Sequence, residues 1–180
     1  MADDQFSKDR KLIQDYLQER SQQTFLHIYS KYNPGLYRIA MACLSYRTDD
    51  ACDALQETWV TALQKLDDFR GASSLKTWLT GILINKCREQ TRRHNGVQQV
   101  PAESVELTGH DPLQAVGDGM DLQKQLQSLP PGCREILVLH DLEGYRHHEI
   151  GELLNIAEGT SKSQLAYAPK LMRYQLTDNE

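Results

Sequence analysis

The 180-residue sequence lacks several features that would place it in a familiar class of protein. No hydrophobic run is long enough to span a bilayer, and the N-terminal residues lack the basic and apolar regions of a secretory signal. The four cysteines, Cys43, Cys52, Cys87 and Cys133, form no CxxC pair. This spacing argues against a disulfide framework or a zinc site and favours a reduced, cytoplasmic protein.

The sequence also has no net positive charge. It contains 20 Lys and Arg residues and 25 Asp and Glu residues, which gives a formal net charge of −5. Such a balance alone argues against nucleic acid as a partner. The charges are unevenly spread, however. Residues 66–93 hold 6 basic and 3 acidic side chains, and residues 159–176 hold 3 basic and no acidic ones. Either segment alone would suit a solvated helix face, but two of them favour a polyanion bound at two places.

Apolar side chains recur at steps of three and four residues through most of the chain, which predicts an all-α fold. Helices are expected over residues 25–43, from a Thr48-Asp49-Asp50 cap to about residue 69, and from Leu75 to Arg93. Pro34-Gly35 would interrupt the first helix or start a second one within it.

Helical periodicity is lost over residues 94–120, which contain four glycines and two prolines. This stretch exceeds the ordinary loop of about 4–6 residues and is typical of a linker. We therefore predict two small helical domains, residues 1–93 and 121–180, joined by a flexible linker. In the second domain, a helix that ends at Gly144 should be lined by Ile136, Leu137, Leu139 and Leu142.

The sharpest local pattern lies within residues 149–167. A short helix ending at Leu154 has the small residue Gly151 in its middle, and Asn155 tolerates the left-handed conformation that ends a helix. A second helix would begin at Thr160 as its N-cap. Two helices that cross at a small residue are typical of a helix-turn-helix or of an ordinary helical hairpin. In the first case the major groove would meet Ser161, Lys162, Ser163, Gln164 and Tyr167.

A histidine-rich segment precedes this pattern and raises the question of a metal site. His148-Glu149 resembles the start of an HExxH zinc motif, but Glu152 stands where the second histidine must be. A metal hydrolase that uses these residues with His140 and His147 therefore fails on ligand spacing. No catalytic residue, cofactor or metal is expected, and the chain is predicted not to be an enzyme.

Two further patterns lie in the N-terminal half. One predicted helix carries a largely polar face on adjacent turns, made of Asp53, Gln56, Glu57 and Val60. By itself, such a face is typical of a solvent-exposed helix surface. Further along, Phe69-Arg70-Gly71 precedes the helix that starts at Leu75. One face of that helix is basic and amide-bearing, which suits phosphate and base-edge contacts. The residues of this face and its flanks are Lys76, Thr77, Gly81, Asn85, Lys86, Arg88, Arg92 and Arg93.

Taken in order, these strings resemble the extracytoplasmic-function, or group IV, sigma factors of bacterial RNA polymerase, from about residue 22 to residue 173. The resemblance implies that Asp53, Gln56, Glu57 and Val60 dock on core polymerase. It assigns opening and reading of the minus-ten element to Phe69, Arg70, Lys76, Thr77, Trp78, Asn85, Lys86, Arg88, Arg92 and Arg93. It assigns reading of the minus-thirty-five element to Thr160, Ser161, Lys162, Ser163, Gln164, Tyr167 and Lys170.

The implied function is that of an alternative sigma factor, which directs promoter recognition, DNA melting and transcription initiation. Its partners would be core RNA polymerase, promoter DNA and an anti-sigma factor, which in this family is often membrane-bound. Loop 69–74 would capture a flipped base of the non-template strand, and Trp78 would suit that role or the helical core. A helix-turn-helix regulator that acts without polymerase, and a sigma-like protein with degenerate promoter reading, are the alternatives.

The C-terminal pattern departs from the family at several positions. The family usually has an apolar residue where Ser161 stands, and basic residues where Gln164, Tyr167 and Pro169 stand. Proline in a helix interior removes one hydrogen bond and costs about 3 kcal/mol, so we expect the second helix to kink or end near Ala168. Fewer basic residues should also weaken phosphate anchoring.

Overall fold

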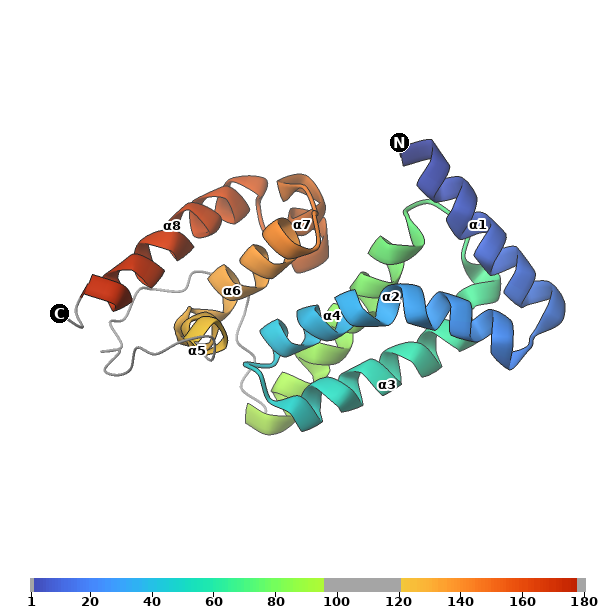
Figure 1. The fold of residues 1–180 in the computed structure, drawn as a ribbon, viewed down its shortest axis with the longest axis horizontal. Helices are drawn as coiled ribbons and strands as arrows, with labels where there is room; N and C mark the ends of the chain where they lie inside the picture. The colour runs from blue at the N-terminus through green and yellow to red at the C-terminus, as the bar shows by residue number, and fades with distance from the viewer. Residues whose placement is uncertain (1, 96–120, 178–180) are drawn as a thin grey trace.

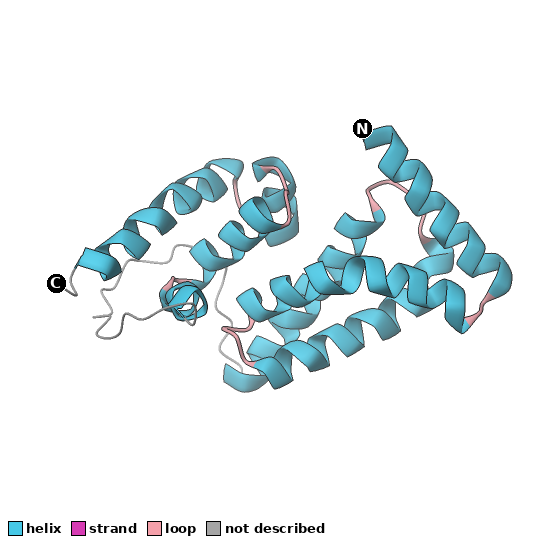
Figure 2. Ribbon diagram, viewed as in Figure 1, coloured by secondary structure: helices cyan, strands magenta, loops and turns pink. Residues whose placement is uncertain are grey.

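The computed structural model describes residues 2–95 and 121–177, and the regular structure of these residues is entirely helical (Figure 2). The all-α prediction is confirmed. None of the described helices is both long and apolar enough to cross a membrane. Most of the predicted linker, residues 96–120, lies outside the described residues. The elements are α1 (Ala2–Glu19), α2 (Gln22–Cys43), α3 (Thr48–Lys65), a 3-10 turn η1 (Leu66–Asp68), α4 (Leu75–Asn95), α5 (Asp121–Ser128), α6 (Pro131–Leu137), a π-helical turn η2 (Val138–Leu142), α7 (His147–Leu154) and α8 (Glu158–Thr177).

The N-terminal unit consists of helices α1 to α4 (Figure 1). Pro34 lies inside α2 without ending it, and Ser21 caps the helix by accepting a hydrogen bond from the Thr24 amide at 3.2 Å. Helix α3 begins at Thr48, so the cap position is Arg47 and the predicted Thr48 cap is wrong. Asp49 and Asp50 fall in the first turn, where the helix dipole favours negative charge.

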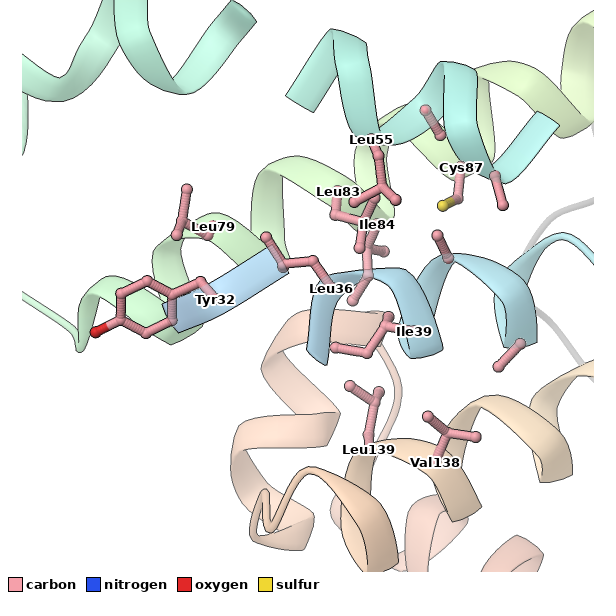
Figure 3. Packing of buried hydrophobic residues seen from close by; sticks show 14 of the residues in the cluster. Tyr32, Leu36, Ile39, Leu55, Leu79, Leu83, Ile84, Cys87, Val138 and Leu139 are labelled. Atoms are coloured by element: carbon pink, nitrogen blue, oxygen red, sulfur yellow. The ribbon is translucent and has the colours of Figure 1, made fainter. Parts of the chain in front are cut away.

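Helices α2, α3 and α4 share one apolar core, which includes the side chains of Leu36, Leu55, Leu79 and Leu83 (Figure 3). Ile28 belongs to the same core. At its edge Trp59 is buried, and its indole nitrogen donates to Asn33 Oδ1 at 3.0 Å. The Trp59 ring also contacts the rings of Phe25 and Tyr29. These contacts satisfy the polar end of the indole while its large apolar surface is removed from water.

The C-terminal unit consists of helices α5 to α8, and α7 and α8 form the predicted helix-turn-helix. Asn155 has φ 57° and ends α7 in the left-handed conformation, as predicted. A Cβ added at Gly151 would lie 2.9 Å from the carbonyl oxygen of Ile156, so this position has no room for a side chain. The small residue thus allows the turn backbone, rather than a second helix side chain, to approach α7 closely.

Two helix boundaries and one lining residue in the C-terminal unit differ from the prediction. Helix α8 begins at Glu158, so Thr160 lies in its first turn and is not its cap. The same helix runs through Pro169 to Thr177, so of the two outcomes expected near Ala168, a kink or an end, the end does not occur. Leu142 is 53% exposed, because the π-helical turn shifts the register of the inner face and Val138 is buried instead.

The two units pack against each other rather than standing apart. Helix α6 and the turn η2 lie along the C-terminal half of α2 (Figure 1). Figure 3 shows Ile39 of α2 facing Val138 and Leu139, and all three are at most 1% exposed. One apolar cluster therefore extends from α2, α3 and α4 into η2 and α7.

Arg134 of α6 makes the polar interactions between the two units, and its side chain is almost fully buried. Its guanidinium donates to the Ala42 carbonyl and the Ser45 hydroxyl, both at 2.8 Å, and so reaches the end of α2. It also donates to the carbonyls of Gln127 and Leu129, at 3.1 and 3.2 Å, near the end of α5. A single side chain thus connects both units through four hydrogen bonds.

We expect Arg134→Met to lower the free energy of unfolding by about 3 kcal/mol, because hydrogen bonds to a charged donor are lost and their buried acceptors are left without partners. Urea unfolding followed by circular dichroism measures this change. Arg70→Met is the matched control, since Arg70 is exposed and the same substitution there should change stability by about 0.5 kcal/mol or less. Equal stability of the two variants would contradict the role given to Arg134.

Gly151→Ala should destabilise the helix-turn-helix by about 1–3 kcal/mol, because the added Cβ meets turn backbone that cannot move aside. Gly159→Ala is the control on the neighbouring helix, where an added Cβ would meet no atom within 4 Å. That variant should be neutral or gain up to about 1 kcal/mol from the higher helix propensity of alanine. Thermal unfolding of both variants tests the pair, and a stable Gly151→Ala protein would refute the close approach.

Candidate nucleic-acid interface

The loop before α4 places two aromatic rings together. Phe69 and Trp78 are half-buried, with ring centroids 5.2 Å apart and planes tilted by 53°. Gly71 has φ 72°, a conformation that favours glycine, and Ser74 caps α4 by accepting from the Thr77 amide at 3.0 Å. Both rings also pack against the apolar core, so Trp78 belongs in part to the core and is only partly buried.

The basic side chains of α4 divide into three groups. Lys76 and Arg88 contact the C-terminal unit, with Lys76 Nζ 3.0 Å from Glu143 Oε2 and Arg88 Nη2 donating to the Leu154 carbonyl at 2.7 Å. Lys86 and Arg93 turn toward α3, as described below. Of the other predicted residues of this face, Asn85 and Arg92 are exposed, whereas Thr77 and Gly81 are half-buried.

The predicted polymerase-binding residues share one outward face of α3. Asp53, Gln56 and Val60 are exposed, and Val60 is 55% exposed although it is apolar. Glu57 is half-buried because Arg93 Nη1 and Lys86 Nζ lie 3.1 and 3.5 Å from its carboxylate oxygens. The hydrogen bond from Arg93 lowers the pKa of the Glu57 carboxyl. Glu57 therefore joins the predicted polymerase face to the predicted DNA face of α4.

On α8 the predicted groove-facing residues do not all point outward. Lys162, Ser163 and Tyr167 are exposed, and Lys162 forms an ion pair with Glu158 at 2.6 Å. Thr160 is half-buried. Lys170 lies in the part of α8 whose side chains fall outside the described residues.

The prediction that Ser161 faces the groove is wrong, because this side chain is fully buried. Ser161, Leu165 and Ala168 follow each other at steps of four and three and form the inner stripe of α8. The Ser161 hydroxyl lies 2.9 Å from His147 Nδ1 of α7, so a polar contact replaces the apolar one usual in the family. Spacing alone could have assigned this residue to the inner face.

Gln164 is also turned inward. It is half-buried, and its amide oxygen lies 2.6 Å from the position of a Cβ added at Gly132 of α6. The side chain therefore fills the space left by that glycine. Because Gly132 is remote in sequence, the residue pattern of α8 contained no signal of this contact.

The histidines form a contact of their own. The rings of His140 and His147 are stacked with centroids 4.6 Å apart, and His147 also contacts Ser161. Within residues 2–95 and 121–177, no group of three or more His, Cys, Asp or Glu side chains is placed to hold a metal ion. The cluster therefore links α7 to α8 and η2.

Comparisons with known proteins agree with this geometry. The family model "Sigma-70 region 2" matches residues 28–97, and "Sigma-70, region 4" matches residues 119–170. The ECF RNA polymerase sigma factor SigM of Mycobacterium tuberculosis is 32% identical over 145 residues, which cover 80% of this chain and 72% of SigM. RNA polymerase sigma factor SigV of Bacillus subtilis is 29% identical over 144 residues, 80% of this chain and 86% of SigV.

Solved structures give the same result. The sigma factor RpoE, in complex with the anti-sigma factor NepR from Bartonella quintana, matches with a TM-score of 0.66 and 28% identity, over 87% of this chain and 98% of RpoE. CnrH, in complex with the cytosolic domain of CnrY, shares the fold with a TM-score of 0.65 and 23% identity, over 96% of this chain and 99% of CnrH. Both family regions are thus present in family order, and the chain belongs to the extracytoplasmic-function sigma factors of RNA polymerase.

Proposed function

We propose that this alternative sigma factor binds core RNA polymerase through α3 and promoter DNA through α4 and α8. The observation that carries the assignment is the ion-pair network of Glu57, Lys86 and Arg93, which fixes the outward face of α3 beside the basic face of α4. Polymerase and the minus-ten element would then be bound by adjacent surfaces of one rigid helix pair. The chain acts as an initiation factor and not as a catalyst.

The face of α3 has the composition of a protein-binding surface. Val60 exposes an apolar side chain among the polar Asp53 and Gln56, and an apolar centre within a polar rim is typical of protein interfaces. Glu57 contributes less directly, because its carboxylate is already held by two cations. We therefore assign it to orienting α4 as well as to docking.

The DNA-binding residues fall into two sets. At the minus-ten element, Phe69 and Arg70 lie in loop 69–74 and Trp78 packs against Phe69, so stacking and positive charge would hold an unstacked base there. At the minus-thirty-five element, Lys162, Ser163 and Tyr167 remain exposed on α8. With Ser161 and Gln164 turned inward, this surface would rely on few direct contacts to base edges.

Regulation by an anti-sigma factor is part of the proposal. RpoE was solved with NepR, and CnrH was solved with the cytosolic domain of CnrY. We infer that this chain likewise functions in the cytoplasm and is held by an anti-sigma factor until a signal releases it. Residues 1–93 would form the polymerase-binding and minus-ten domain, and residues 121–180 the minus-thirty-five domain.

Run-off transcription on a promoter library tests the function. Core polymerase alone should give no promoter-specific transcripts, and addition of this chain should give transcripts from a defined subset of templates that share two elements. The same library bound to the chain without core polymerase separates a sigma factor from an independent regulator. Specific duplex binding by the free chain, together with no retention on core polymerase in a pull-down, would contradict the proposal.

The docking face is tested by the double variant Asp53→Ala/Gln56→Ala, which should weaken binding to core polymerase at least about tenfold, since about 1.4 kcal/mol of contact energy corresponds to that factor. Fluorescence anisotropy with labelled sigma factor and purified core measures the change. Gln14→Ala/Asp68→Ala removes the same two residue types from exposed positions of α1 and η1 and should bind as the wild type does. Unchanged core affinity of the first variant would show that the face is misassigned.

A further inference from the structure

Helix α1 precedes residue 28, where the match to the sigma-70 region 2 family begins. It is nevertheless fixed to the rest of the N-terminal unit. Asp9 of α1 is 3% exposed, and its carboxylate lies 2.8 Å from Lys31 Nζ of α2. Further along α1, the Tyr16 ring packs against Phe25 of α2 with ring centroids 6.3 Å apart. The helix is therefore a structural part of the unit that holds the minus-ten loop.

The junction between α1 and α2 is formed by Arg20, which has an unusual backbone conformation. Its φ is 49°, in the left-handed region that side chains other than glycine seldom adopt. The Arg20 amide donates to the Tyr16 carbonyl at 2.7 Å, and the guanidinium lies over the Tyr16 ring, 5.5 Å from its centre. A residue persists in such a conformation where the contacts around it hold it there. Arg20 is held on both its backbone and its side chain.

The Arg20 guanidinium also reaches a segment that is distant in sequence. It forms an ion pair with the carboxylate of Asp67 in η1, 47 residues further along the chain. On one side of Asp67, Leu66 is buried in the core, and its carbonyl accepts a hydrogen bond from the Phe69 amide at 3.2 Å. On the other side, the chain continues directly into loop 69–74. Arg20 therefore fastens the turn from which this loop starts.

The effect of this contact is expected to be local. The side chains of Arg20 and Asp67 are 47% and 56% exposed, and an exposed ion pair adds little to global stability. It does restrict η1, and with it Phe69, whose ring lies 5.2 Å from that of Trp78. A group that binds an unstacked base must be held close to its productive position, so a small displacement of the loop affects function more than stability.

We propose that Arg20 is a positioning residue for promoter opening. Through Asp67, it holds Phe69 and loop 69–74 where they capture a base of the minus-ten element. The inference rests on the proposed DNA-binding role of this loop, and it extends that role to a residue outside the matched family region. Direct binding of a DNA phosphate by Arg20 is the competing explanation, and it makes the opposite prediction for Asp67.

Arg20→Ala and Asp67→Ala test the contact from both sides. On a template that core polymerase transcribes with the wild-type chain, each variant should slow open-complex formation about threefold, a factor within the range of an exposed ion pair. Time-resolved permanganate reactivity of unpaired thymines measures the rate. The double variant should be no slower than either single one, because both changes remove the same contact. The exchange Arg20→Asp/Asp67→Arg should restore most of the rate.

The sign of the Asp67→Ala effect separates positioning from phosphate binding. If Arg20 bound a phosphate, removal of Asp67 would free the guanidinium and take an acid away from DNA, so the rate would rise. Such a rise would overturn the proposal. Asp68→Ala is the matched control, since it removes an exposed acid from the same turn. It should keep the wild-type rate, and an equal slowing by Asp68→Ala would also overturn the proposal.

Arg20→Gly separates positioning from folding. Glycine adopts a φ of 49° without steric cost, so the temperature of thermal unfolding should be at or above that of the wild type. Open-complex formation should nevertheless slow as it does for Arg20→Ala, because the guanidinium is lost. An Arg20→Gly protein that opens the promoter at the wild-type rate would contradict the role given to this side chain.

A measurement on the free chain keeps the proposal independent of transcription. The chain has two tryptophans, so fluorotryptophan labelling gives two fluorine NMR signals, and Trp78→Phe identifies that of Trp78. This signal should shift in Arg20→Gly and Asp67→Ala, where Phe69 moves relative to Trp78, and should stay in place in Asp68→Ala. A shift combined with no core-dependent transcripts from the wild type would refute the proposed function alone. An unchanged signal in both variants, with an active wild type, would refute positioning by Arg20.

Discussion

The position of the buried Arg134 guanidinium governs how the two halves of this sigma factor fit together. Burial of a charged group is costly unless its hydrogen-bonding capacity is met, and four acceptors meet it here. One of them, the Ser45 hydroxyl, lies in the turn that follows α2, where Ser45 and Tyr46 have φ values of 53° and 60°. Non-glycine residues in this conformation cost about 1–3 kcal/mol each. The hydrogen bond from Arg134 to Ser45 therefore stabilises a strained turn as well as the contact between the units.

The contact between the two units combines an apolar area with a polar group at each end. The contact of Ile39 with Val138 and Leu139 buries apolar surface between the two units. Apolar burial alone does not fix how one unit is oriented on the other. Arg134 at one end and Glu143 at the other set the register of the C-terminal unit on α2 and α4. Because Glu143 is held by cations whose side chains are partly exposed, its end of the contact is closer to solvent than the end at Arg134.

Sequence reasoning predicted the features that depend on local spacing. The helices, the left-handed Asn155 and the need for a small residue at Gly151 all follow from patterns within a few residues. It could not predict contacts between distant segments, such as Arg134 with Ala42, which are 92 residues apart. Pro169 shows that residue propensity is only a weak guide to where a helix ends. The proline removes one backbone hydrogen bond, yet α8 continues past it to Thr177. Ser161 was misassigned because residues 161–164 were treated as one groove-facing run, although the steps from Ser161 to Leu165 and Ala168 place it on the inner face of α8.

Glu135, next to Arg134, gives the contact between the units a pH dependence of definite sign. Burial raises the pKa of this carboxyl to about 7, opposed by the charges of Arg134 and Arg88. In the unfolded chain the carboxyl releases its proton near its ordinary pKa of about 4.3. Between about pH 4.3 and pH 7, the Glu135 carboxyl is therefore protonated in the packed state and ionised in the unfolded state. The full free-energy cost of burying its negative charge is reached only above about pH 7. As the pH falls from 7 toward 4.3 that penalty disappears, so mildly acidic conditions favour packing around α6 and mildly alkaline ones oppose it.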